Sequence, residues 1–161
     1  MADFDRILAE MGPALQRVAA AYERDQALRQ DLVQDMLIAI ARALPRLRDE
    51  ARLRPFVFRI AHNKGVDHVA SRIAAAAEEE IPEAVAGVEA SPEDEMIARQ
   101  RSERLAAAVR RLDLPYRQVI ALLLEDLSYT EIAETLGLGV SNVGVRINRA
   151  KALLRSLLDH E

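Results

Sequence analysis

The sequence predicts an all-α protein made of two small helical domains joined by a flexible acidic linker. Apolar residues recur every three to four positions through both halves of the 161-residue chain, which is the period of helices buried on one face. Aromatic residues make up only 4% of the chain, and no segment shows the alternation that is typical of strands. A run of carboxylates without any Lys or Arg separates the two helical halves.

The charge distribution defines the predicted domains. Residues 1–74 and 99–161 each carry a net charge of +2, whereas residues 75–98 hold eight carboxylates and no basic residue. This middle segment also contains two prolines and a glycine, so it cannot bury enough apolar surface to offset the entropy of ordering. We expect a linker that is either a solvated tether or an acidic segment occupying a basic channel of a partner. Ser91 followed by Pro92 predicts the start of the next helix.

The first domain is predicted to contain three helices. Apolar residues from Phe4 to Tyr22 form one face, which we expect to be interrupted at Gly12-Pro13. A second helix, with i, i+4 apolar spacing from Leu28 to Leu44, must end or kink at Pro45. A third starts at Pro55 and continues to Ile73. Three helices over about 70 residues can bury a modest core.

The second domain has clearer helix boundaries. One helix carries Leu105, Val109 and Leu112, and another begins at Pro115. Ser128 and Glu131 have the spacing of a capping box, and Gly137 supplies a left-handed C-cap before Leu138. The last helix is expected to bury five side chains: Val140, Val143, Ile147, Ala150 and Leu154. Two helices joined by a short glycine-containing turn have the arrangement of a helix-turn-helix.

The surface of the last helix is a candidate for DNA binding. From Ser141 to Leu158 the chain has four basic residues and no acidic one. Asn and Arg can bond base edges, and cations suit phosphates. Val145 lies nearly opposite Val143, so we expect it to be exposed, where it could meet a thymine methyl. The alternative is a helical hairpin whose cations only favour the C-terminal half of the helix. The candidate contacts are Ser141, Asn142, Val145, Arg146, Asn148, Arg149 and Lys151.

Motifs in both domains resemble those of the extracytoplasmic-function (ECF) sigma factors of bacterial RNA polymerase. DLVQD at residues 31–35 is similar to the family's DLVQE/D motif of region 2. LRPFVFRIAHN at 53–63 is similar to LRxWLFRIARN, and Val66-Asp67-His68 to the IDxxR stretch. Leu114-Pro115 and LSYTEIAE at 127–134 resemble the signatures of region 4. The resemblance covers nearly the whole chain outside the linker.

The resemblance implies that residues 1–74 bind core polymerase and recognise and melt the −10 promoter element, and that the helix-turn-helix of residues 99–161 binds the −35 element. The implied contacts to the clamp helices of the largest polymerase subunit are Asp31, Leu32, Val33, Gln34 and Asp35; a solvated helix face is the alternative for the two carboxylates. The implied −10 contacts are Phe56, Phe58, Arg59, Asn63, Lys64, Asp67, His68 and Arg72. Phe56 and Phe58 have the core as an alternative location.

The chain departs from the family pattern in ways that affect promoter choice. Gly144 and Val145 stand at positions where family members usually have a basic residue and Ser. Gly144 has no side chain that could contact a base. The −35 sequence that relatives recognise therefore cannot be assumed for this protein. The resemblance also implies that the linker threads through cation-lined channels of the polymerase, where Glu78, Glu79 and Glu80 would imitate RNA.

Other classes of protein are disfavoured by the sequence. The chain has no cysteine, three histidines and no glycine-rich phosphate loop, so we expect neither an enzyme, nor a metal site, nor a cofactor. No signal peptide or membrane span is evident, which predicts a cytoplasmic protein. A stand-alone helix-turn-helix regulator is the remaining alternative; it predicts a dimer on a palindromic site. Control by an anti-sigma factor is a further implication of the resemblance.

Overall fold

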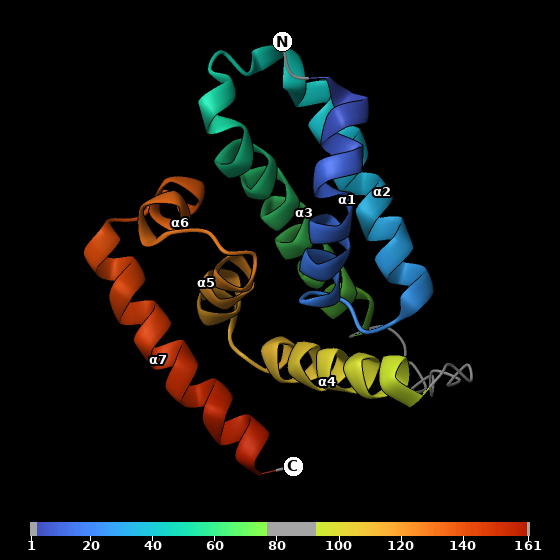
Figure 1. The fold of residues 1–161 in the computed structure, drawn as a ribbon, viewed down its shortest axis with the longest axis vertical. Coiled ribbons are helices and arrows are strands. Elements are labelled where there is room, and N and C mark those ends of the chain that lie inside the picture. The colour runs from blue at the N-terminus through green and yellow to red at the C-terminus, as the bar shows by residue number, and fades with distance from the viewer. Residues whose placement is uncertain (1–2, 77–92, 161) are drawn as a thin grey trace.

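The computed structural model describes residues 3–76 and 93–160, and every regular element within them is a helix (Figure 1). The N-terminal domain, residues 3–76, contains α1 (Phe4–Ala20), α2 (Gln26–Ala43), two short 3₁₀ turns η1 (Leu44–Arg46) and η2 (Glu50–Arg52), and α3 (Leu53–Ala76). The C-terminal domain, residues 93–160, contains α4 (Glu93–Arg110), α5 (Leu114–Leu124), α6 (Tyr129–Leu136) and α7 (Val140–Asp159). The predicted all-α class is confirmed.

Helix α1 is unbroken, so the predicted interruption at Gly12-Pro13 is wrong. Proline inside a helix costs about 3 kcal/mol because a backbone hydrogen bond is lost. Ile7, Met11 and Leu15 keep helical spacing across the proline and are all buried. Burial of each such side chain contributes roughly 1.5–3 kcal/mol, which outweighs the cost of the proline.

The loop between α2 and α3 follows from the predicted break at Pro45. Helix α2 starts at the N-cap Asp25, whose side chain accepts a hydrogen bond from the backbone N–H of Leu28, and it ends at Ala43. Pro45 then lies within η1, and the chain reverses through η2 into α3. This segment carries Arg46, Arg48 and Arg52, all of them exposed on the surface of the domain.

The turn between α6 and α7 is built as the sequence predicts. Ser128 and Glu131 form a reciprocal capping box at the start of α6. Gly137 has φ 68°, and the backbone N–H of Leu138 donates to the carbonyl of Ala133, which closes the helix end. Val143, Ile147 and Ala150 are fully buried, whereas Val140 is 48% exposed. The predicted burial of Val140 is wrong because it is the first residue of α7 and lies beyond the edge of the core.

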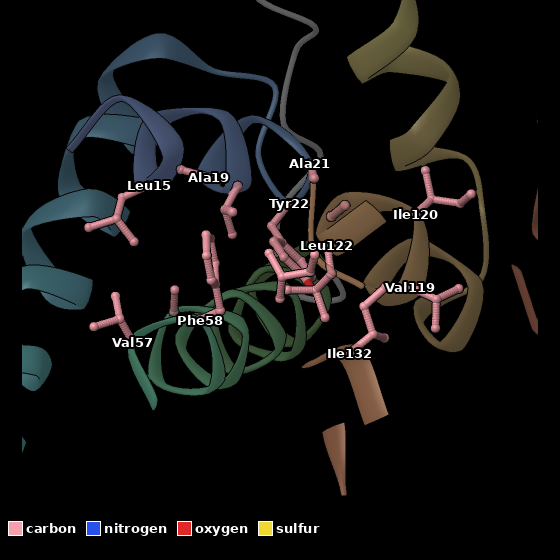
Figure 2. Close-up of a cluster of buried hydrophobic side chains, with 14 of the residues drawn as sticks. Leu15, Ala19, Ala21, Tyr22, Val57, Phe58, Val119, Ile120, Leu122 and Ile132 are labelled. Atoms are coloured by element: carbon pink, nitrogen blue, oxygen red, sulfur yellow. The ribbon is translucent and has the colours of Figure 1, made fainter. Parts of the chain in front are cut away.

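The two domains pack on each other and share one apolar core. The buried cluster in Figure 2 includes Tyr22 and Phe58 from the N-terminal domain and Leu122 and Ile132 from the C-terminal domain. Helix α6 lies against α3, and α4 crosses below the ends of α1 and α2 in the view of Figure 1. The structure extends α3 to Ala76 and starts α4 at Glu93, so both ends of the predicted linker 75–98 are helical. Its remaining part, including Glu78, Glu79 and Glu80, lies outside the described residues.

Candidate nucleic-acid interface

The outer face of α7 carries the side chains that the sequence proposed for duplex DNA. Ser141 and Asn142 lie exposed in the first turn, where the backbone N–H groups of a helix have no partner within the helix. Val145 is 48% exposed, which confirms its predicted position opposite the buried Val143. A Cβ placed on Gly144 would lie 3.8 Å from Cε2 of Tyr129 on α6, which is ordinary van der Waals contact. The exposed side of the first two turns of α7 thus combines polar groups with the valines Val140 and Val145.

Cations continue this face towards the middle of α7. Asn148, Arg149 and Lys151 are exposed, and Arg146 is half-buried. The opposite side of the helix is held by Ile147 and Ala150 in the core. A helix fixed by one apolar side and presenting amide, guanidinium and ammonium groups on the other can enter a major groove with both base-edge and phosphate contacts.

A second polar face follows α3. Arg59, Asn63 and Asp67 recur at four-residue intervals and are exposed, while Lys64 is half-buried beside them. Phe56 is half-buried, but Phe58 is only 1% exposed. The implied contact of Phe58 with the −10 element is therefore corrected: in this structure its ring belongs to the core, and it cannot stack on an unpaired base.

His68 and Arg72, two further residues implied in −10 binding, are engaged within the protein. Nε2 of His68 lies 3.0 Å, and Nε of Arg72 3.1 Å, from Oε1 of the buried Glu23. Burial alone would raise the pKa of the Glu23 carboxyl. Hydrogen bonds from the backbone N–H of Asp25 and from His68, together with the charge of Arg72, hold this pKa below its ordinary value. His68 and Arg72 thus tie α3 to the end of α1.

An arginine-lined hollow lies at the start of α3; the sequence indicated Phe56 and Arg59 of its lining, but not Arg46, Arg48 or Arg52. It has a volume of about 510 Å³, and its walls include Arg46, Arg48, Arg52, Arg59 and the half-buried Phe56. All four guanidinium groups belong to exposed residues. Cations around an aromatic ring suit a single nucleic-acid strand, through its phosphates and through stacking. Five arginines between positions 46 and 59 are the signal in the sequence that could have revealed it.

One wall of this hollow, the arginine hollow from here on, comes from the other domain. Glu134 of α6 lines it, and Oε1 of Glu134 lies 3.5 Å from Nη1 of Arg52. The C-terminal domain therefore adds a second carboxylate, besides that of Asp49, to a hollow lined by four cationic side chains of the N-terminal domain. No motif indicated this contact, because it joins residues 82 positions apart (134 minus 52).

The face of α2 that is implied in polymerase binding is only partly available. Asp31, Gln34 and Asp35 are exposed, but Leu32 and Val33 are 1% and 5% exposed. The implied contacts of Leu32 and Val33 are therefore corrected: both side chains lie in the core of the N-terminal domain and hold the helix in place. The polar residues of DLVQD remain as a compact acidic and amide surface.

Neither a metal centre nor a membrane span is found in the part of the chain that the structure describes. Groups of three or more potential ligand side chains are absent from residues 3–76 and 93–160. None of the helices in these ranges is long and apolar enough to cross a bilayer.

Comparison with known families gives two matches, one for each domain. Residues 7–73 match the family described as Sigma-70 region 2, and residues 102–154 match the family described as Sigma-70, region 4. The first match contains α2 and most of α3, and the second contains α6 and most of α7. Both candidate surfaces therefore lie within matched segments.

Individual sigma factors are similar in sequence to this chain across both domains. The chain is 34% identical to the RNA polymerase sigma factor CnrH of Cupriavidus metallidurans over 97% of its own length and 86% of that protein. It is 28% identical to the sigma factor SigZ of Bacillus subtilis, covering 84% of this chain and 75% of that one.

Solved structures show the same fold. The structure of CnrH in complex with the cytosolic domain of CnrY matches with a TM-score of 0.71 and 31% identity, over 98% of this chain and 88% of that chain. The sigma factor RpoE of Bartonella quintana, in complex with the anti-sigma factor NepR, matches with a TM-score of 0.76 and 23% identity, over 99% and 98% of the two chains. The chain belongs to the RNA polymerase sigma factors, and among them to the ECF family.

Proposed function

We propose that three separate surfaces divide the work of this sigma factor. The exposed Asp31, Gln34 and Asp35 of α2 bind the clamp helices of core polymerase. The polar face of α3, together with the arginine hollow, holds the melted −10 strand. The outer face of α7 enters the major groove of the −35 element. The domains thus act as region 2 and region 4, while the chain itself has no catalytic role and works in the cytoplasm.

The observation that carries this proposal is the separation of polar and apolar residues within the matched motifs. On α2, Asp31 and Asp35 are exposed while Leu32 is buried. On α7, Asn148 and Arg149 are exposed while Ile147 is buried. Each motif therefore presents its hydrogen-bonding groups outward, as a binding surface requires. A stand-alone helix-turn-helix regulator would not need the two faces of the N-terminal domain.

An anti-sigma factor is part of the proposal. Two sigma factors of the same fold have been solved with a protein partner, one of them named as an anti-sigma factor. The chain has sequence similarity to the first over both domains. We expect a regulator of this kind to contact the exposed face of α2, because that would block polymerase binding directly.

Capture of core polymerase tests the α2 assignment. The tagged protein is incubated with purified core enzyme, and the double variant Asp31→Ala/Asp35→Ala is compared with Glu10→Ala. Glu10 is an exposed acid of α1 whose carboxylate pairs with Arg6, one turn away on the same helix. We expect wild type and Glu10→Ala to retain the large subunits and the double variant to lose them. Equal retention by all three proteins would contradict the assignment.

A further inference from the structure

The outer face of α7 has a gap at Gly144, where the helix carries no side chain. Gly144 lies one turn after Val140 and one turn before Asn148, so these three residues share one face of the helix. Val143 and Ile147 beside them are fully buried and fix the direction of this face. The gap therefore lies between two exposed residues, of which Val140 is 48% exposed.

An aromatic ring closes one side of this gap. Helix α6 lies against α7 (Figure 1), and its first residue is Tyr129. A Cβ built on Gly144 would lie 3.8 Å from Cε2 and 4.0 Å from Cδ2 of this tyrosine. Within the part of the chain that the structure describes, no other group outside α7 itself comes within 4 Å of that Cβ. Tyr129 is 39% exposed. The gap, with Val140 and the ring of Tyr129 as its walls, is called the Gly144 notch below.

The walls of the Gly144 notch are apolar, and the major groove of DNA offers one kind of apolar group. Base edges there present hydrogen-bond donors and acceptors, except for the 5-methyl group of thymine. A methyl group in the notch leaves water for contact with the ring of Tyr129 and the side chain of Val140, which is favourable. A polar base edge in the same place gives up water without gaining a hydrogen-bond partner, which is unfavourable. The notch therefore discriminates in favour of thymine.

Asn148 lies beside the notch and suits the partner base of thymine. The side-chain amide of asparagine can pair with both N6 and N7 of adenine in the major groove. Four residues separate Gly144 from Asn148, which is about 6 Å along the helix at about 1.5 Å per residue. A base-pair step rises about 3.4 Å. An adenine bonded to Asn148 and a thymine in the notch therefore lie within about two steps of each other.

The polar groups around the notch favour DNA over a protein as its occupant. Ser141 and Asn142 are exposed before it, in the first turn of α7. Arg149 and Lys151 are exposed after it. Such groups on both sides of a reading residue can hold a helix on phosphates while it contacts base edges. A protein that covered the notch would have to remove these groups from water as well, which costs free energy.

We propose that the Gly144 notch holds the 5-methyl group of a thymine in the −35 element, so that thymine at this position determines which promoters the protein selects. The inference rests on the proposed function, because it takes the outer face of α7 as the surface that binds the −35 element. It goes further by assigning a base, and it gives a role to a residue that has no side chain. The specificity comes from the space that Gly144 leaves beside Tyr129.

The inference is tested by moving a methyl group from the DNA to the protein. Gly144→Ala places a methyl group in the notch at ordinary contact distance from the ring of Tyr129, so the fold is retained. Replacement of thymine by uracil removes only the 5-methyl group from the DNA. Gly12→Ala is the matched control, because it makes the same change within α1, where a Cβ meets nothing within 4 Å.

The probe is a fluorescent duplex with the −35 block that wild-type holoenzyme enriches from a randomised promoter library. Uracil replaces one thymine of this block at a time, and fluorescence anisotropy gives the affinity of holoenzyme assembled with each variant. At one position, wild type and Gly12→Ala should bind the thymine duplex about fourfold more tightly than the uracil duplex, which corresponds to burial of one methyl group. In Gly144→Ala this preference should fall below about 1.5-fold or reverse, because the notch is already filled.

Three results would overturn the inference: a −35 block without thymine, equal affinity of wild type for every pair of duplexes, or an undiminished preference in Gly144→Ala. Methyl-independent binding of an enriched block would count against the notch alone and would point to a protein as its occupant. Failure of the wild-type holoenzyme to enrich any upstream block would instead count against the proposed function, and the notch would fall with it.

Discussion

Gly65 of α3 lies directly against the ring of Tyr22, in the turn that follows α1. A Cβ built on Gly65 would lie 2.5 Å from Cδ2 of Tyr22, closer than carbon atoms approach each other in folded proteins. The ring cannot move away freely, because its hydroxyl bonds Nδ1 of the buried His62 and the guanidinium of Arg117 lies over its face, 5.9 Å from the centroid. This contact therefore sets how closely α3 approaches the turn that follows α1.

Gly65→Ala should lower the free energy of unfolding by about 1–3 kcal/mol, the usual cost of overpacking a core. Gly12→Ala is the control, because Gly12 is also helical but a Cβ there meets nothing within 4 Å. That change should be neutral or stabilising by about 0.4–1 kcal/mol. Urea unfolding followed by circular dichroism measures both. Equal stability of the two variants would show that the ring of Tyr22 leaves room for a Cβ at position 65.

Acid should destabilise the protein through His62. This residue is fully buried, and burial lowers the pKa of its imidazole to about 3 from an ordinary value of 6.5. The unfolded chain therefore binds a proton below about pH 6.5 that the folded protein refuses until about pH 3, so stability falls as the pH decreases through this window. The loss between pH 6.5 and pH 5 should be on the order of 1.5 kcal/mol.

Chemical unfolding at several pH values checks this expectation. His62→Gln should be less stable at neutral pH and should show a much weaker pH dependence between pH 6.5 and pH 5. Glu23 and Glu103 also have lowered pKa values, but their protonation affects stability only at more acidic pH, below about 4.5. His160→Gln, at the exposed end of α7, should retain the dependence of wild type. A similar slope in His62→Gln would show that another group is responsible.

Substitutions on α7 should separate base reading from phosphate binding. Asn148→Ala should change the preferred base at one −35 position, at a cost of about 1–3 kcal/mol for the original site. Arg149→Ala should weaken all duplexes alike and reduce the slope of log affinity against log salt by about 1. Ser156→Ala, near the end of the same helix, is the control. Fluorescence anisotropy with the holoenzyme and a set of −35 duplexes measures these effects, and an unaltered preference in Asn148→Ala would show that this residue does not read a base.

Features of the fold that depend on local chemistry were predictable from the sequence. The capping box of Ser128 and Glu131, the left-handed Gly137 and the helix end before Pro45 each need only a few neighbouring residues, and all three are confirmed. The exposure of Val145 follows from helical spacing alone. A break at Pro13 was expected on the same local grounds, but it is overruled by the burial of the apolar face on both sides of it.

Features that join distant segments were not predictable. Nothing near Arg17 indicates that its partner lies 108 positions later, and nothing near Arg52 indicates Glu134. The i, i+4 spacing from Leu28 to Leu44 already places Leu32 on the apolar face, but it does not indicate that Val33 is buried as well, because that depends on how α1 and α3 pack around α2. For the same reason, the sequence alone could not decide whether Phe58 lies in the core or on the surface. Such contacts require the three-dimensional arrangement.

The most direct test of the central assignment is transcription in vitro from a library with randomised upstream sequence. Core polymerase is supplied with wild type, Asn148→Ala or Asn63→Ala, and the templates that yield transcripts are sequenced. The account predicts two enriched sequence blocks at fixed spacing, with the upstream block altered by Asn148→Ala and the downstream block by Asn63→Ala. Transcription no greater than that of core enzyme alone, or a single palindromic block, would contradict it.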